Sequence, residues 1–335
     1  PMDQKRIIDE FKELVSIEVH SRDERAIADV LKEKLTALGL TVTEDKAGEA
    51  LGGNTGNLYA QLPGSADGEP VLFSAHMDRV GNHGHIVPLV KEEGKIVSDG
   101  TSILAGDDIG GVAAILAMLR EVKEKQIPHG PIEVAFSVCE ETGVEGSRQY
   151  DFSKFRSKSA FVYDASGKAG TIVLAAPSKG RVTIHVHGVT AHAGNEPEKG
   201  LNALKVAADL IMQLPDGRLS PVSTANFSII EAGSATNVVC DLVTITGEQR
   251  SRDAKEYQQI SADIQAAADR ISEKYHTKIE VELHTLYHAF KLEETARPCV
   301  LAKEAAEAVG AAPFFKEGGG GMDANHFNEH GIAAV

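Results

Sequence analysis

The feature that most constrains this chain is a series of short apolar runs that alternate with longer, helix-forming segments. The runs at 70–76, 132–138 and 160–163 are predominantly apolar, which is typical of strands buried on both faces of a sheet. A long stretch rich in Ala, Leu and Ile runs from Gly106 to about Gln126 and predicts a helix. Strands alternating with helices predict an α/β domain whose doubly wound, mixed sheet is covered by helices on both faces.

Two amphipathic helices are predicted ahead of this region. Apolar side chains recur at a spacing of three to four residues over 4–19 and again over 23–38. Gly39 follows the second stretch directly, and glycine is the residue most favoured just past the end of a helix. We therefore expect the chain to open with two helices, the second ending at Gly39.

The pattern of elements changes near Lys179 and changes back after Thr285. Between these points, strand-like stretches and helices at about 199–214 and 253–274 follow in the order β-α-β-β-α-β, which predicts a small ferredoxin-like α+β domain. We interpret this domain as an insertion into the α/β domain. The predicted limits are 1–178 and 289–335 for the two parts of the α/β domain, and 179–288 for the insertion.

Charge and hydropathy exclude several classes of partner. The chain carries 49 acidic against 34 basic side chains, a formal charge of −15, which argues against nucleic acid or an anionic membrane surface as a partner. No apolar run approaches the roughly 20 residues of a membrane span, and the first residues lack the apolar segment of a signal peptide. We therefore expect a cytoplasmic protein whose ligands are small molecules or peptides.

Residues that can bind metal or move protons follow directly on the predicted strands. His76 and Asp78 end the first run, and because residues i and i+2 of a strand share a face, the carboxylate can reach the imidazole. An aspartate beside a metal-bound histidine is the usual device for fixing the tautomer and orientation of the ring. The alternative interpretation is a surface histidine with an unrelated aspartate.

Two acidic pairs and a single aspartate occupy comparable positions. Asp107 and Asp108 begin the long helix, where acids either complement the helix dipole or include a bridging metal ligand. Glu140 and Glu141 follow the second run, and neighbouring acids on irregular backbone can divide metal binding and proton transfer between them; a solvated acidic loop is the alternative. Asp164 ends the third run in the same way.

These side chains share one explanation. The carboxyl ends of strands in an open α/β sheet form its ligand crevice, so we expect the histidine and the acids to meet there. Imidazole with carboxylates suits zinc, with cobalt or manganese able to substitute, and the excess of carboxylates suits two cations about 3.5–4 Å apart. The sequence therefore predicts a two-metal site at this edge of the sheet.

Eight short segments occur in the order and approximate spacing of a known family: SAHMDRV, GDDIGG, CEETGVEGS, VYDAS, GVTAHAGNEPEKGLNAL, GSATNVV, EQRS and GGGMDANHF. The set resembles the co-catalytic dizinc exopeptidases, which include peptidase T, carboxypeptidase G and acetylornithine deacetylase, and it is most similar to the peptidase T-like branch. The resemblance covers essentially the whole chain. It implies that the α/β domain is catalytic and that the insertion is a lid and dimerisation domain, through which a homodimer forms.

The resemblance also implies the metal ligands. His76, Asp107 and Asp164 would hold one zinc ion, and Asp107 would bridge to a second zinc that Glu141 also binds. Asp78 would orient His76. The family pattern selects the first acid of the GDD segment, so the second is not expected to be a ligand.

Catalytic and substrate-binding residues follow from the same comparison. Glu140 would be the general base that activates water and passes the proton to the leaving amine. In the inserted domain, His192 would donate to the substrate carbonyl oxygen as negative charge develops there. Asn237 and Arg250 match lid positions that hold substrate, and Arg250 suits a bidentate grip on a carboxylate.

One position departs from the family pattern. The family's last metal ligand is a histidine well beyond the segment that GGGMDANHF resembles, and the sequence ends at GIAAV, before that position. His326 and His330 come too early to match it. We therefore expect the second zinc position to have one protein ligand fewer, so that one zinc ion is held firmly and the other is held weakly or is absent.

The expected function is that of a zinc-dependent exopeptidase acting on short peptides in the manner of a tripeptide aminopeptidase. One alternative is an N-acyl amino acid deacylase that uses the same residues. Another, from a different class, is a catalytically silent metal-binding protein, favoured if the last histidine is absent. A purely structural protein would not need acids at so many strand ends.

Overall fold

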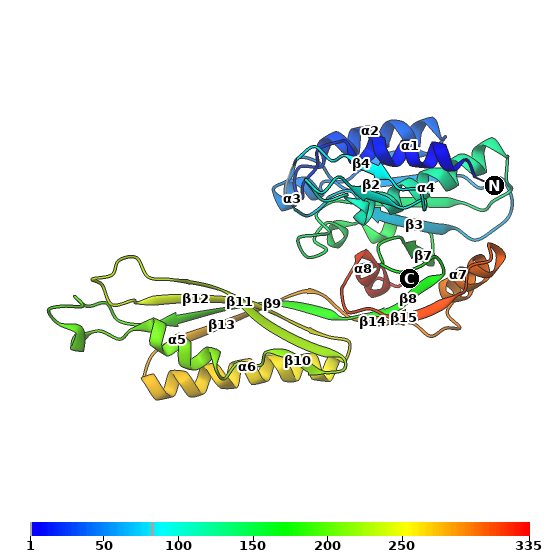
Figure 1. Ribbon diagram of the computed structural model, residues 1–335. Helices are drawn as coiled ribbons and strands as arrows, with labels where there is room; N and C mark the ends of the chain where they lie inside the picture. Colours follow the sequence, from blue (N-terminus) through cyan, green and yellow to red (C-terminus); the bar gives the residue numbers. More distant parts are fainter. Residues whose placement is uncertain (1, 82–83) are drawn as a thin grey trace. The chain divides into compact units, whose positions relative to one another are not determined.

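The computed structural model describes residues 2–81 and 84–335, which divide into two compact units (Figure 1). Unit 1 comprises Pro1–Ala175 and Lys291–Val335, and unit 2 comprises Ala176–Phe290. The second unit is therefore inserted into the first. Unit 1 is a mixed α/β structure and unit 2 is an α+β structure, which confirms the predicted fold class.

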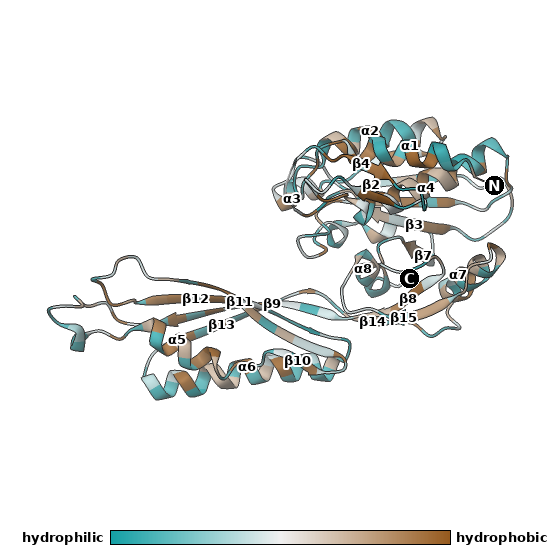
Figure 2. Ribbon diagram, viewed as in Figure 1, coloured by the Kyte–Doolittle hydropathy of each residue, from teal (hydrophilic) through white to brown (hydrophobic). Residues whose placement is uncertain are grey.

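The centre of unit 1 is a six-stranded mixed sheet, whose strands in spatial order are β1 (Thr41–Glu44), β2 (Leu58–Leu62), β6 (Ile132–Ser137), β3 (Val71–His76), β7 (Ser159–Val162) and β16 (Ala333–Ala334). β3 runs parallel to both β6 and β7, and β16 runs parallel to β7. β2 is antiparallel to both of its neighbours. Figure 2 shows the inner strands of this sheet as largely hydrophobic, as expected for strands buried on both faces.

The core of unit 1 lies between this sheet and three helices, α1 (Gln4–Val15), α2 (Arg25–Ala37) and α4 (Gly106–Glu124). Leu14, Leu116 and Phe136 are among its fully buried side chains. α1 ends at Val15, earlier than the predicted helix 4–19. The Ser16 hydroxyl, just past the helix, donates to the carbonyl of Lys12 at 2.6 Å, a local bond that competes with continued helix.

The rest of unit 1 consists of short elements around this core. A second sheet in the order β14-β8-β15 is formed by strands that are far apart in sequence, with β15 parallel to β8. The two helices that follow the insertion pack against β7 and β16. The bounds of these elements are α3 Ala47–Leu51, β4 Pro88–Val90, β5 Ile96–Ser98, β8 Thr171–Ala176, β14 Phe290–Lys291, α7 Arg297–Ala308, β15 Phe314–Glu317 and α8 Asp323–Glu329, with 3-10 turns at Ser147–Gln149 and Phe152–Lys154.

Unit 2 is a five-stranded antiparallel sheet with helices α5 (Ala203–Ile211) and α6 (Ala254–Tyr275) packed on it. Its strands in spatial order are β10 (Gly217–Ser220), β11 (Ser223–Ala232), β12 (Leu242–Ser251), β9 (Ser178–His187) and β13 (Ile279–Tyr287). Alternate residues of β9 are buried under the helices. β10 is absent from the predicted order because it is short and largely exposed, so that no apolar pattern marks it.

Within the described part of the chain, no helix is both long and apolar enough to cross a membrane.

An ion-pair network ties α2 to the edge strand β1. Arg25 contacts both oxygens of the Glu44 carboxylate, at 2.6 and 3.0 Å, and Lys32 contacts one of them. Although partial burial opposes ionisation of Glu44, the hydrogen bonds from Arg25 and Lys32 hold its pKa well below the ordinary value of 4.5.

We predict that Glu44→Gln lowers the free energy of unfolding at pH 7 by roughly 1–2 kcal/mol. Because the pKa of Glu44 is depressed in the folded state, this stabilisation is present above about pH 4.5 and is lost progressively as the pH falls. Urea unfolding of both proteins between pH 7 and pH 2 measures the difference. A difference that stays constant over this range would contradict the prediction.

Candidate metal centre

The strand order of unit 1 brings the predicted metal-binding residues to one place. His76 is the last residue of β3, Glu140 lies just past the end of β6, and Asp164 lies just past the end of β7. Because β3 is parallel to both neighbours, these three positions meet at the same edge of the sheet. Asp107 reaches the same place from the start of α4.

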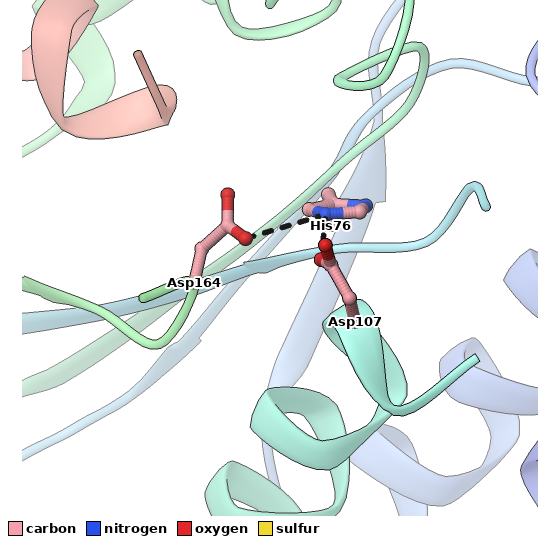
Figure 3. A group of neighbouring side chains, drawn as sticks. All are labelled: His76, Asp107 and Asp164. Carbon is pink, nitrogen blue, oxygen red and sulfur yellow. Dashed lines mark hydrogen bonds and ion pairs between the residues drawn. The ribbon is translucent and has the colours of Figure 1, made fainter. Parts of the chain in front are cut away.

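Carboxylates surround the imidazole of His76. Its Nε2 atom lies 3.0 Å from Asp107 Oδ1, 3.6 Å from Asp164 Oδ1 and 3.7 Å from Glu140 Oε2. Figure 3 shows Asp107 and Asp164 converging on the ring from a helix start and from a loop. The His76 side chain is 1% exposed and that of Asp107 is 69% exposed, so the cluster is closed at the imidazole and open to solvent at Asp107.

Two overlapping groups of side chains in the described residues have the spacing needed to hold a metal ion. One is His76, Asp107 and Asp164, and the other is His76, Glu140 and Glu141, with the ligand atoms of each group within 4.8 Å of one another. All four predicted ligands are present, but here His76 is the residue common to both groups, whereas the resemblance implies that Asp107 is shared.

Hydrogen bonding at the ring supports a cation beside Nε2. The Nδ1 atom of His76 lies 2.9 Å from the backbone carbonyl oxygen of Asp78, which can only accept, so the proton of a neutral ring is on Nδ1. Nε2 then presents a lone pair towards carboxylate oxygens, an arrangement that becomes favourable when a cation lies between them. The Oε1 atom of Glu141 is also buried without a hydrogen-bond partner in the described structure. The donor set therefore fits a divalent cation.

The electrostatics of the cluster point the same way. Burial, followed by the charge of Asp164, raises the pKa of Glu140 well above its ordinary value, and burial raises the pKa of Glu141 to about 7. Burial disfavours the charged form of His76, yet hydrogen bonds with the neighbouring carboxylates raise its pKa. Several acids thus share one poorly solvated site, and divalent cations would relieve their mutual repulsion.

Asp78 is fully buried and supports two parts of the cluster. Its Oδ1 atom lies 3.3 Å from His76 Nδ1, and its two carboxylate oxygens accept the backbone N–H groups of Glu140 at 2.9 Å and Glu141 at 3.2 Å. Asp108 is also buried, and its carboxylate accepts the backbone N–H of His76 at 3.0 Å. It thereby anchors the end of β3 and belongs to neither metal-binding group.

Glycine is required at one position of the GDDIGG segment. A Cβ atom on Gly111 would lie 2.5 Å from the carbonyl oxygen of Tyr163, next to Asp164. At Gly110 nothing lies within 4 Å, and at Gly106 the nearest atom is 3.8 Å away. Close approach of the backbone to the site therefore explains Gly111 but neither of the other two glycines.

Two of the three predicted substrate-binding residues are neighbours in unit 2. The N–H of Ala193 donates to the carbonyl of Asn237 at 3.0 Å, which places Asn237 beside the loop that carries His192. The Nδ1 atom of His192 accepts N–H groups from Gly194 and Asn195, both at 3.1 Å. The proton of the neutral ring is therefore on Nε2, which presents a hydrogen-bond donor to solvent.

The third residue, Arg250, lies on β12 and is held by its own neighbours. Its Nε atom donates to Glu248 Oε1 at 2.7 Å, and Nη1 lies 3.5 Å from the hydroxyl of Tyr287. Lys179 contacts the same glutamate at 2.9 Å. The Glu248 carboxylate thus pairs with both the Lys179 ammonium group and the Arg250 guanidinium, and it orients the guanidinium.

The two late histidines belong to neither metal-binding group of the described residues. His326 is buried, and its Nε2 atom lies 3.0 Å from the carbonyl oxygen of Val144. The ring of His330 stacks on Phe152 with 3.8 Å between centroids.

Sequence reasoning missed two buried acids near the cluster. Asp323 accepts the Ser137 hydroxyl at 2.5 Å, and burial raises its pKa to about 6. Glu24 accepts the N–H of Cys139, the residue before Glu140, at 2.9 Å. Asp323 lies within the GGGMDANHF segment, which offered a signal, whereas Glu24 is 115 residues from its partner and no local pattern marks it.

Two peptidase family models and a bacterial relative match this chain. The family model described as the peptidase dimerisation domain matches residues 177–276, and that of peptidase family M28 matches residues 57–194. The uncharacterized protein YqjE of Bacillus subtilis is 36% identical over 334 residues, which cover 100% of this chain and 90% of that protein.

Two solved structures extend the likeness. The aminopeptidase PepT of Bacillus cereus is 39% identical, with a TM-score of 0.89 over 100% of this chain and 90% of that one. A tripeptidase of Staphylococcus aureus is 33% identical, with a TM-score of 0.93 over 99% of this chain and 89% of that one.

The mixed α/β unit, its imidazole–carboxylate cluster and the inserted α+β unit define a metal-dependent peptidase, a hydrolase. The chain belongs to the peptidase T-like branch of the M20 family of metallopeptidases. The family expected from the eight sequence segments is thereby confirmed.

We predict that His76→Ala lowers the metal content of the protein below half of the wild-type value, because this residue belongs to both metal-binding groups. Elemental analysis after equilibration with zinc and gel filtration measures the bound metal. His187→Ala is the control, since that histidine lies in unit 2 and pairs with Glu280. Equal metal content in all three proteins would refute the assignment.

Proposed function

We propose that this protein is a zinc-dependent tripeptide aminopeptidase, which hydrolyses the amide bond after the first residue of short peptides. The observation that carries the proposal is the meeting of His76, Asp107, Glu141 and Asp164 at one sheet edge, in a chain 39% identical to an aminopeptidase and 33% identical to a tripeptidase. An imidazole with several carboxylates suits zinc, with cobalt or manganese as possible substitutes.

Each metal-binding residue has a proposed task. His76, Asp107 and Asp164 would hold one zinc ion, and Glu141 together with Asp107 would hold the second. Asp78 keeps the imidazole in the tautomer that leaves Nε2 available. When bound, the two cations polarise the scissile carbonyl group and lower the pKa of water in the site.

Glu140 is the proposed general base. Its carboxylate is buried beside the cluster, 3.7 Å from His76 Nε2, and Asp78 holds its backbone N–H. Poor solvation makes the carboxylate a stronger proton acceptor than an exposed glutamate. One of its carboxylate oxygens accepts a proton from the attacking water, and Glu140 later gives that proton to the leaving amine.

Unit 2 supplies the proposed contacts to the substrate. His192 donates from Nε2 to the carbonyl oxygen as negative charge develops on it, with the proton placed there by the two N–H groups at Nδ1. Asn237, beside the same loop, forms a hydrogen bond with the peptide, either as donor or as acceptor. Arg250, already oriented by Glu248, binds a carboxylate of the substrate.

A second copy of the chain is the proposed protein partner. The family model that matches residues 177–276 describes a dimerisation domain. Ile229 and Ile230 on β11 are 54% and 49% exposed, which provides apolar surface in that domain for a contact between subunits. The deacylase alternative rests on the same residues, and the similarity to an aminopeptidase and a tripeptidase does not favour it.

We predict that Glu140→Ala lowers kcat for tripeptides by about 10²–10⁴-fold, because the site loses its proton acceptor. Metal content stays close to that of the wild type, since the predicted ligands remain. Steady-state kinetics on zinc-loaded protein, with elemental analysis of the same samples, measures both quantities. Acetylated amino acids, assayed beside the tripeptides, separate a peptidase from a deacylase. Undiminished turnover by the variant would reject Glu140 as the base.

A further inference from the structure

The loop after β6 is held in an unusual way. The three successive backbone N–H groups of Cys139, Glu140 and Glu141 all donate to buried carboxylates. Asp78 accepts the second and third of these, and Glu24 accepts the first, at 2.9 Å. Two acids from distant parts of the chain therefore define the path of the residues that carry the proposed base and one metal ligand.

Glu24 is an unusual residue to find in this position. It is 0% exposed, at the N-cap position of α2, and its side chain makes no capping bond to that helix. Oε1 accepts the Cys139 N–H, and Oε2 is buried without a hydrogen-bond partner among the described residues. Burial is costly for a carboxylate, which is why burial raises the pKa of Glu24 to about 7. An apolar side chain would avoid this cost but would leave the Cys139 N–H without its acceptor, so the glutamate is tied to this one hydrogen bond.

The backbone of Cys139 explains why an external acceptor matters. This residue has a φ of +50°, a left-handed conformation that non-glycine residues seldom adopt. The turn redirects the chain from the end of β6 so that Glu140 and Glu141 enter the cluster at His76. The bond from Cys139 to Glu24 stabilises this conformation, and the thiol of Cys139 lies 3.6 Å from the same oxygen.

The segment that carries Glu24 makes further contacts with the same region. The Ser21 hydroxyl donates to Asp78 Oδ2 at 2.6 Å. The Arg22 guanidinium contacts Glu145 at 2.8 Å, near the end of the loop. Residues 21–24 thus pack against the loop and hold it by side-chain contacts. Among them, Glu24 contacts the turn that precedes Glu140.

We propose that Glu24 is a positioning residue for the reaction: through the N–H of Cys139 it sets the orientation of Glu140, without touching substrate or metal. This inference rests on the proposed role of Glu140 as general base. The rate of the reaction should therefore depend on the length of the Glu24 side chain, because the hydrogen bond requires an oxygen at one particular distance from the α2 backbone.

Two conservative variants separate the reach of the side chain from its charge. Glu24→Gln keeps an oxygen at the same distance and loses the charge, whereas Glu24→Asp keeps the charge and withdraws the oxygens by about 1.5 Å. We expect Glu24→Asp to lower kcat roughly 100-fold, as a displaced catalytic group does, with KM and zinc content within twofold of wild type. Glu24→Gln should retain kcat to within about threefold.

Glu10→Gln is the matched control for loss of a buried carboxylate. Glu10 is 8% exposed and is paired with Arg120 and Lys34. It lies on α1 and makes none of the hydrogen bonds that hold the loop. We expect Glu10→Gln to lower stability while kcat stays within twofold of wild type. Thermal unfolding of all variants separates a loss of stability from a loss of positioning.

Hydrogen exchange gives a second measurement that needs no activity. Amides in a peptide covering 138–145 should exchange faster in Glu24→Asp than in wild type, and at the wild-type rate in Glu24→Gln. The proposal is overturned if Glu24→Asp retains both kcat and slow exchange, or if Glu24→Gln loses as much kcat as Glu24→Asp. A wild-type protein that cleaves no peptide would reject the proposed function instead, and the exchange rates would still decide whether Glu24 holds the loop.

Discussion

The parallel pairing of β3 with both β6 and β7 is the constraint on which the site depends. It carries three chain segments to one edge of the sheet, so that a carboxylate oxygen of Glu140 and one of Asp164 each lie within 4 Å of the Nε2 atom of His76. These strands are predominantly apolar, and the acids of the cluster begin where the hydrogen-bonded ladder stops. The sheet therefore concentrates acids in a place that its own apolar layers keep poorly solvated.

That concentration has a cost which a bound cation can offset. Carboxylates that share a buried site repel one another, and burial alone disfavours their charged forms. The same crowding and burial of negative charge increase the attraction of the cluster for divalent metal ions and the ability of its carboxylates to accept protons. Asp78 links these effects, since its carboxylate lies 3.3 Å from the Nδ1 atom of His76 and also accepts two N–H groups of the loop after β6. Loss of the Asp78 carboxylate would therefore disturb base and metal ligand together.

Much of the fold and of the candidate site could be predicted from sequence, because the patterns that indicate them involve residues close together in the chain. Continuous apolar runs indicated the buried strands, and three- to four-residue periodicity indicated α1 and α2, although Ser16 ended the first helix earlier than the pattern did. His76 and the acids that follow or begin regular elements were expected together for that reason, and the family resemblance selected Asp107, Glu141 and Asp164 among them. The structure brings the ligand atoms of these residues into two overlapping groups. β10 escaped prediction because a short exposed strand has no apolar alternation to mark it.

By itself the sequence determined the order of the elements, the mixed α/β class with its insertion, and which acids stand at strand ends. These are properties of neighbouring residues, and hydrophobic periodicity and chain position express them directly. Only the tertiary structure decided that His76 belongs to both candidate metal-binding groups, that Gly111 alone of its segment faces a crowded carbonyl, and that Glu24 supports Cys139. Such contacts join residues up to 115 positions apart, and a hydrogen bond between them depends on distances that the folded backbone sets and no local pattern records.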